Sequence, residues 1–202
     1  MKPLRVFFTG VGGQGTLTAT KLLAETALEQ GLDVSAGEIH GMAQRGGVVH
    51  SFVLLGGYVS PKISQGEADV ILGFEPMETL RALPFLKKDG LVLSSEDPVP
   101  PISVSTGKQE YPSVEMIKSK TLECSPRAVF LPCITLARET GVVQTANTVL
   151  MGAFFSMGIL PFGLDVLLDS IKKRLKPKLV DVNLQAARLG ADYARQSTQE
   201  SV

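Results

Sequence analysis

The sequence predicts a three-layer α/β/α fold with a mostly parallel, Rossmann-like sheet. Three features favour this class: an apolar strand that runs through a glycine turn into a helix near the N-terminus, a second β–α–β succession farther along, and apolar segments typical of strands covered on both faces. The 202 residues suffice for one domain with a sizeable core. We therefore expect a single domain over 1–196 and a disordered tail over 197–202.

The N-terminal strand, turn and helix form the first candidate binding segment. The apolar run from Leu4 leads into glycines spaced as G-x-G-x-x-G, and a helical pattern follows. Glycines let the backbone approach a ligand closely, and the unpaired N–H groups of a first helical turn favour an anion or a carbonyl oxygen. The alternative is that the glycines only close a tight connection. The candidate ligand-binding residues are Gly10, Gly12, Gly13, Gln14, Gly15 and Thr16.

The residue after the last glycine argues against one class of ligand. A phosphate-binding loop of the NTPase type needs a lysine there, because its ammonium must reach the terminal phosphates. Thr16 occupies that position. We therefore do not expect an NTPase.

The remaining elements follow from hydrophobic periodicity and from glycine and proline breaks. A helix that ends at Gln30 and a short strand over 32–36 complete a βαβ unit with the first strand. A second such unit has strands over 68–74 and 91–95, with a helix that begins at Pro76. Other expected strands cover 48–55, 102–105 and 128–131, and other expected helices cover 112–118, 132–139, 165–176 and the C-terminal region to about Gln196.

The segment 145–158 is helical in pattern and carries small or apolar residues on every side. A helix that is apolar all round must be buried. Two explanations remain open: it is the central core helix of this chain, or it forms a contact with another subunit.

The segment from His40 to Gly47 is the second candidate, because it has three glycine breaks and no clean period. The guanidinium of Arg45 in this segment can hold a carboxylate or phosphate through two hydrogen bonds. Gln44 and Arg45 are therefore also candidate ligand-binding residues. The alternative is a surface arginine paired with Glu38. Glu38 also lies about where the ribose-binding acid of a dinucleotide site falls, which keeps such a site open as an alternative.

Composition excludes several classes of protein. Twenty basic residues balance twenty acidic ones, so we expect neither nucleic-acid nor membrane binding. Two histidines and two cysteines are too few for a metal site or a four-thiolate cluster, and we expect a cytoplasmic protein without a bound metal. Cys133 follows a proline near a helix start, where a thiol pKa can fall, but no base is assigned to it, and we name no catalytic residue.

Three segments together resemble a known family. They are Gly10 to Gly15, the run His40-Gly-Met-Ala-Gln-Arg-Gly-Gly, and Ala68-Asp69 before an apolar strand that closes on Phe74-Glu75. They are similar to the gamma-type subunit of 2-oxoacid:ferredoxin oxidoreductases, and most similar to the small subunits of the members that act on indolepyruvate. Asn147, Thr148 and Asn183 also match family positions, and the resemblance covers nearly the whole chain.

The resemblance implies a subunit of a heteromeric enzyme that oxidatively decarboxylates a 2-oxoacid, here an aryl pyruvate. Coenzyme A would accept the acyl group and ferredoxin the electrons. The chain lacks cysteines for a cluster and a thiamine-diphosphate motif of Gly-Asp-Gly followed by paired asparagines. Thiamine diphosphate, Mg and iron–sulfur clusters are therefore expected on a large alpha subunit.

The isolated chain is then expected to be inactive and to form a homodimer that covers its exposed apolar surface. Three alternatives stay open at this point. They are a gamma subunit of a pyruvate or 2-oxoglutarate ferredoxin oxidoreductase, a stand-alone dinucleotide-binding oxidoreductase, and a non-catalytic assembly module.

Overall fold

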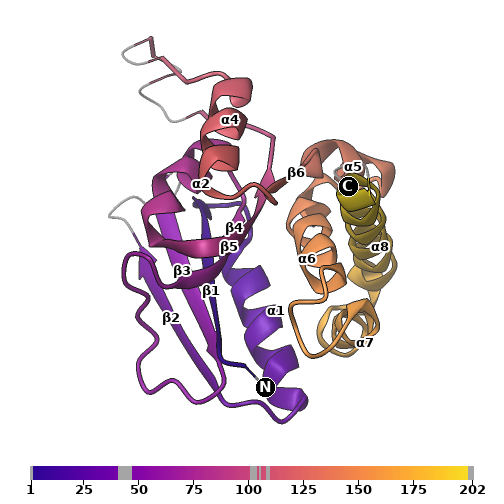
Figure 1. Ribbon diagram of the computed structural model, residues 1–202. Coiled ribbons are helices and arrows are strands. Elements are labelled where there is room, and N and C mark those ends of the chain that lie inside the picture. Colours follow the sequence, from indigo (N-terminus) through magenta and orange to yellow (C-terminus); the bar gives the residue numbers. More distant parts are fainter. Residues whose placement is uncertain (1, 41–46, 101–103, 105, 108–109, 200–202) are drawn as a thin grey trace.

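The computed structural model describes residues 2–40, 47–100, 104, 106–107 and 110–199. Figure 1 shows one sheet with helices on both sides, and the strand order is β2-β3-β1-β4-β5-β6. The α/β class predicted from the sequence is confirmed. The strands are β1 (Leu4–Val11), β2 (Val34–His40), β3 (Val48–Leu55), β4 (Ala68–Gly73), β5 (Leu86–Ser95) and β6 (Val129–Leu131).

The helices follow the predicted succession closely. They are α1 (Thr16–Glu29), α2 (Pro76–Ala82), α4 (Val114–Cys124), α5 (Cys133–Glu139), α6 (Ala146–Ser156), α7 (Leu164–Arg174) and α8 (Pro177–Gln199), with 3-10 turns η1 (Leu83–Phe85) and η2 (Val143–Thr145). Helix α8 extends past the predicted start of the disordered tail at residue 197. The strand expected over 102–105 lies largely outside the described residues. In the part of the chain that is described, none of the helices combines the length and the apolarity needed to cross a bilayer.

The sheet is mixed because β3 runs against its neighbours. Strand β3 pairs antiparallel with both β1 and β2, whereas β1, β4, β5 and β6 pair parallel in succession. The predicted βαβ unit is therefore changed: β1 and β2 share a direction, but β3 lies between them. The β-branched and apolar composition of 48–55 identifies a strand but carries no information on its direction, which explains why the sequence did not reveal this insertion.

The two faces of the sheet belong to two separate cores. Side chains alternate along a strand, so Val6 and Phe8 of β1 join the core that contains α1, α5, α6, α7 and α8, while Phe7 joins the core that contains Ala82 of α2. Helix α4 packs on α2 and buries Ile117. The three-layer arrangement follows, with the larger helical layer on the α1 face.

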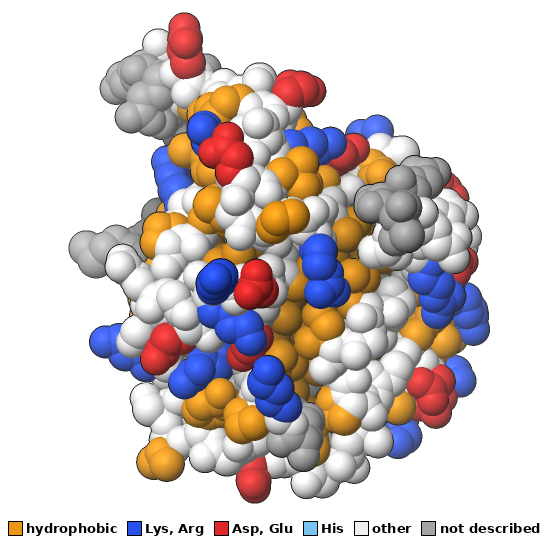
Figure 2. All heavy atoms as spheres, viewed as in Figure 1, with side chains coloured by type: hydrophobic (Ala, Val, Ile, Leu, Met, Phe, Trp, Pro, Cys, Tyr) orange, Lys and Arg blue, Asp and Glu red, His pale blue; other side chains and the backbone are white. Residues whose placement is uncertain are grey.

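Charge is mixed over the surface. Figure 2 shows basic and acidic side chains interspersed on one face, with apolar atoms gathered along the junction between the sheet and the helices α6 to α8. This distribution agrees with a formal net charge of zero.

Helix α6 is the central core helix of this chain. All residues from Thr148 to Phe155 are buried, and the helix packs closely on α8. The contact is made at glycines: a Cβ added at Gly152 would lie 2.0 Å from the Ala187 carbonyl oxygen, and one at Gly190 would lie 1.8 Å from the Val149 carbonyl oxygen. Of the two explanations for segment 145–158, the core helix of this chain is therefore correct. A homodimer is not needed to cover α6.

We predict that Gly152→Ala or Gly190→Ala lowers the free energy of unfolding by about 3 kcal/mol or prevents folding, because each methyl group would overlap a backbone carbonyl. On an exposed helical face the same change would add stability, by about 1 kcal/mol. Urea unfolding followed by circular dichroism measures the difference. Gln185→Ala, on the exposed face of α8, is the matched control and should change stability little.

His50 lies in an aromatic group on the α2 face of the sheet. Its ring is centred 5.1 Å from the Phe7 ring and 6.3 Å from the Phe85 ring. Partial burial lowers the pKa of His50 below its ordinary value of 6.5. The folded state therefore favours the neutral imidazole.

We predict that the wild-type chain loses stability as pH falls below about 6.5, since the unfolded state binds the proton first. His50→Gln removes this contribution, so the stability difference between the two proteins should change between pH 7.5 and 5.5. Urea unfolding at several pH values measures it. An unchanged difference over this range would contradict the prediction.

Candidate functional site

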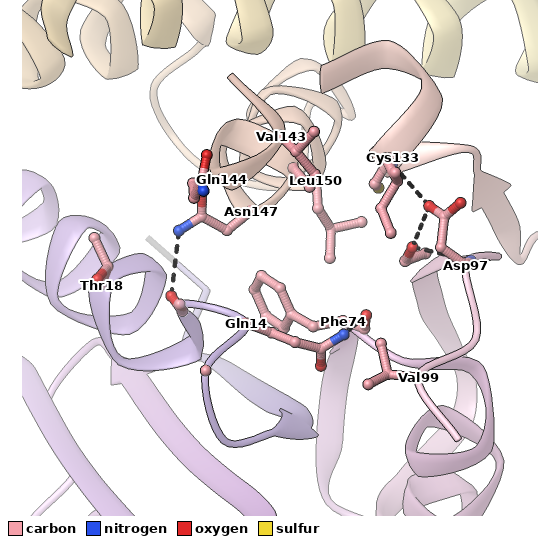
Figure 3. A pocket seen from close by; sticks show the side chains of 15 residues that line it. Gln14, Thr18, Phe74, Asp97, Val99, Cys133, Val143, Gln144, Asn147 and Leu150 are labelled. Atoms are coloured by element: carbon pink, nitrogen blue, oxygen red, sulfur yellow. Dashed lines mark hydrogen bonds between the residues drawn. The ribbon is translucent and has the colours of Figure 1, made fainter. Parts of the chain in front are cut away.

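A cavity of about 430 Å³ lies at the carboxyl ends of β1, β4 and β5. Ligands of open α/β sheets bind at this edge. Figure 3 shows the cavity between the glycine turn and the first turns of α5 and α6. Its walls are formed by Gly13, Gln14, Gly15, Thr18, Phe74, Ser95, Asp97, Val99, Cys133, Ile134, Val143, Gln144, Ala146, Asn147 and Leu150.

The glycine turn has a conformation and a packing that require glycine. Gly13 and Gly15 have φ values of 105° and 80°, in the left-handed region that side chains disfavour. At Gly10 the limit is space, because a Cβ there would lie 2.8 Å from Gln14 Oε1. Gly15 is also the N-cap of α1 and has no side-chain cap, so the first-turn N–H groups of α1 are left for other acceptors.

Gln14 uses its side-chain amide to join two strands. Its Oε1 accepts a hydrogen bond from Val11 N at 2.9 Å, and its Nε2 donates to Phe74 O at 2.8 Å. The end of β1 is thereby tied to the residue that follows β4. Gln14 shapes the cavity, and its amide is already engaged in holding the turn.

The six candidate residues of the turn divide into two groups. Gly13, Gln14 and Gly15 line the cavity. The other three lie behind it: Gly10 packs against Gln14 and Phe74, Gly12 donates its N–H to Gly47 O at 2.9 Å, and Thr16 is buried. Gly10, Gly12 and Thr16 therefore stabilise the turn and do not line the cavity.

Gln44 and Arg45 lie outside the described residues, so their candidate roles remain predictions. Gly47, the last residue of the segment from His40, does have a defined position. Gly47 lies beside Gly12 through the backbone hydrogen bond given above, next to the glycine turn.

Asn147 links the turn to the opposite wall. Its Nδ2 donates to Gly15 O at 3.4 Å, and a Cβ at Gly15 would come within 2.4 Å of that nitrogen. Asn147 therefore fixes the start of α1 against the start of α6. The family resemblance had singled out this residue, whereas its local sequence gave no reason to.

Asp97 is a site residue that sequence reasoning missed. Its Oδ2 accepts hydrogen bonds from Ile134 N at 2.8 Å and from Ser95 Oγ at 2.9 Å, so it caps the start of α5. It follows β5 in an acidic, proline-rich stretch that the sequence identifies only as a loop. Nothing in the local pattern marks it.

The pKa of the Cys133 thiol is raised, although its place near a helix start would allow the pKa to fall. Cys133 does begin α5, but the side chain is buried, and removal from water raises the pKa of the thiol far above its ordinary value. The effect of burial exceeds that of the helix start. At neutral pH the group is a thiol, which is a poor nucleophile.

The cavity is suited to binding. Apolar walls from Phe74, Val143 and Leu150 face the backbone of the glycine turn and the amide of Asn147. Among the described lining residues, the Ser95 hydroxyl donates to Asp97 Oδ2, but that carboxylate oxygen also accepts from Ile134 N and so holds the start of α5. Within the described ranges, no group of three or more His, Cys, Asp or Glu side chains could hold a metal.

The dinucleotide alternative is weakened by the topology. Glu38 lies on β2, and its position pairs with Ser51 of β3, which in turn pairs with Phe8 of β1. A ribose-binding acid belongs on the strand next to the glycine turn. Here an antiparallel strand separates the two.

Comparison with known proteins identifies the family. Residues 5–193 match the family described as pyruvate ferredoxin/flavodoxin oxidoreductase. The chain belongs to this family.

Two curated relatives match this chain over nearly their full length. Subunit IorB of indolepyruvate oxidoreductase from Pyrococcus horikoshii is 43% identical over 97% of this chain and 98% of that protein. Subunit IorB from Archaeoglobus fulgidus is 37% identical over 95% of each chain. The resemblance that the sequence motifs indicated is confirmed.

Solved structures agree in fold. The gamma subunit of a keto/oxoacid ferredoxin oxidoreductase from Geobacter sulfurreducens has a TM-score of 0.69 and 20% identity, covering 96% of this chain and 99% of that one. The 2-oxoglutarate:ferredoxin oxidoreductase from Magnetococcus marinus also has a TM-score of 0.69, with 19% identity, but the match covers only 32% of its chain. The fold thus occurs both as a separate subunit and within a longer polypeptide.

We predict that Gln14→Glu lowers the free energy of unfolding by about 1–3 kcal/mol, because a carboxylate cannot donate to the Phe74 carbonyl and would repel it. Urea unfolding measures the loss. Gln65→Glu makes the same chemical change at an exposed position and should be nearly neutral. Equal effects of the two variants would show that the amide link between β1 and β4 does not matter for stability.

Proposed function

We propose that this chain is the small subunit of a heteromeric 2-oxoacid:ferredoxin oxidoreductase that acts on indolepyruvate or a related aryl pyruvate. The observation that carries the proposal is the identity of 37% and 43% with indolepyruvate oxidoreductase subunits over almost the whole chain. The common gamma subunit of pyruvate/ketoisovalerate oxidoreductases from Pyrococcus abyssi is 29% identical. That difference favours the indolepyruvate enzyme over a pyruvate enzyme.

The cofactors are assigned to a larger subunit in this proposal. The sequence contains two cysteines, and the structure leaves Cys124 exposed and Cys133 buried in the core. Iron–sulfur clusters are normally held by four thiolates. The larger subunit would hold the clusters together with thiamine diphosphate and Mg, and bound thiamine diphosphate supplies the electron sink for decarboxylation. Coenzyme A and ferredoxin complete the reaction.

In this proposal the chain positions groups supplied by the substrate, the coenzyme or the larger subunit, and it shields them. The first-turn N–H groups of α1 and the cavity beside Gly13 and Gly15 would receive a polar group of the substrate, the coenzyme or the larger subunit. Arg45 would hold a carboxylate or phosphate. In this proposal residues 1–196 act as one domain, and the complex is cytoplasmic, where free cysteines persist.

The test is co-expression of this chain with the larger subunit. We expect the purified pair to oxidise indolepyruvate with coenzyme A and ferredoxin, and the isolated chain to show no activity. Arg45→Ala should leave the pair assembled and lower kcat/KM at least tenfold, which corresponds to about 1.4 kcal/mol of transition-state stabilisation.

Arg195→Ala, at an exposed position on α8, is the matched control and should retain activity. Decarboxylation of an aryl pyruvate by this chain alone would refute the proposal. If Arg45→Ala left assembly and both apparent substrate constants unchanged, the role of Arg45 would be wrong while the subunit assignment stood.

A further inference from the structure

Another cavity, of about 180 Å³, lies at the start of α2. Its walls come from the end of β1, the start of β3, the first turns of α2 and the chain between β5 and α4. Among the described residues, it shares only Val99 with the cavity beside the glycine turn. Pockets for drug-sized ligands measure about 300–1,000 Å³, so this cavity suits a smaller molecule.

Two buried carboxyl groups line this cavity, and the first of them is fully engaged. Glu75 is 1% exposed and caps the start of α2, where its Oε2 accepts a hydrogen bond from Glu78 N at 2.9 Å. Its Oε1 accepts from Val99 N at 3.3 Å and from the Tyr111 hydroxyl. Both oxygens of Glu75 therefore serve the structure of this chain.

Glu78 differs from Glu75 because one of its oxygens is left over. Its side chain is 5% exposed, and its Oε1 accepts a hydrogen bond from Arg81 Nη1 at 2.6 Å. Its Oε2 is buried and has no hydrogen-bond partner among the described residues. A buried acceptor without a donor is destabilising, and in native proteins such an atom calls for an explanation such as a bound ligand. Glu78 Oε2 can accept a hydrogen bond from a molecule in the cavity.

The charge of the wall favours a cation as that molecule. Three carboxyl groups line the cavity, on Glu75, Glu78 and Glu110, against the single guanidinium of Arg81. Burial raises the pKa of Glu78, and Arg81 only partly opposes this. A bound cation would stabilise the ionised carboxylate. A metal ion is less suited, since no group of three His, Cys, Asp or Glu side chains in the described part of the chain could hold one.

The rest of the wall is suited to a short alkyl chain. Val11, Val48, Met77, Val99 and Pro112 contribute apolar surface to the cavity. An alkyl group placed against them is removed from water, which favours binding. The cavity thus combines an apolar wall with one buried acceptor in a negatively charged surrounding.

We propose that this cavity binds a short alkylammonium ion. The ammonium would donate to Glu78 Oε2, and the alkyl chain would lie along Val11, Val48 and Val99. The ion is either a free amine or the side chain of a lysine from another protein chain, since both present the same group. The inference does not depend on the oxidoreductase assignment, because this chain supplies every residue that it uses.

The test is a titration of the ¹⁵N-labelled full chain with butylamine at pH 7, followed by nuclear magnetic resonance. The amine is then an ammonium ion, because its pKa lies near that of lysine, about 10.4. We expect saturable shifts of the amide signals of Glu78 and Val99. Butan-1-ol lacks the charge and butyltrimethylammonium lacks the N–H donor, so each should bind at least tenfold more weakly.

A variant tests the acceptor. Glu78→Gln keeps the shape of the side chain and removes its charge, and it should weaken butylammonium binding at least tenfold. Glu139→Gln makes the same change at an exposed position of α5 outside the cavity and should alter binding less than twofold. The proposal is overturned if the wild type shows no saturable shifts, if the three probes bind equally, or if the two variants have equal effects.

A second variant keeps the test decisive if Glu78→Gln does not fold. Val99 is 36% exposed, so Val99→Lys can be accommodated, and its tethered ammonium should compete for Glu78 and weaken butylammonium binding at least tenfold. Val99→Met, without the charge, should bind like the wild type. Normal binding to Val99→Lys would contradict the proposal.

The source of the ammonium is separated by one more probe. Nα-acetyl-lysine methylamide carries the same group on a peptide backbone. Binding as tight as that of butylammonium would assign the cavity to a lysine side chain of another chain, and binding at least tenfold weaker would assign it to a free amine. Either result supports an ammonium site.

Discussion

The burial of β1 on both faces is the constraint on which the rest of the structure depends. Alternation sends Val6 and Phe8 into the core beneath α1 and α6, and Phe7 into the core beneath α2. Both faces of the sheet must then be covered by helices, which requires three layers. Strand β1 is held between β3 and β4, so the turn that follows it starts from a fixed position.

The site depends on links between elements. The amide of Gln14 joins the ends of β1 and β4, and Asn147 joins the start of α1 to the start of α6. Helix α6, which begins next to Asn147, packs closely on α8 at Gly152 and Gly190. A cavity built in this way is pre-formed, which lowers the cost of ordering a ligand or partner against it. Such an arrangement fits a subunit that positions and shields groups supplied by another chain.

Much of the fold could be predicted from local pattern. Continuous apolar runs identified β1 and β4, and the helical spacing of apolar residues identified α1. The direction of β3 could not be predicted, since its β-branched and apolar composition does not depend on the direction of the strand. Within the site, the glycine turn was evident from its spacing. Asp97 was not, because its partner Ile134 lies on another element.

The sequence by itself determined where the backbone turns tightly, which segments are buried, and that two cysteines are too few for a cluster; these follow from the conformational limits and side-chain chemistry of residues close together in the chain. Only the tertiary structure decided that Gly13 and Gly15 face the cavity while Gly10 and Gly12 support it. It also decided that burial raises the pKa of Cys133. The reason is physical: desolvation and hydrogen bonding depend on segments that are distant in sequence and adjacent only after folding.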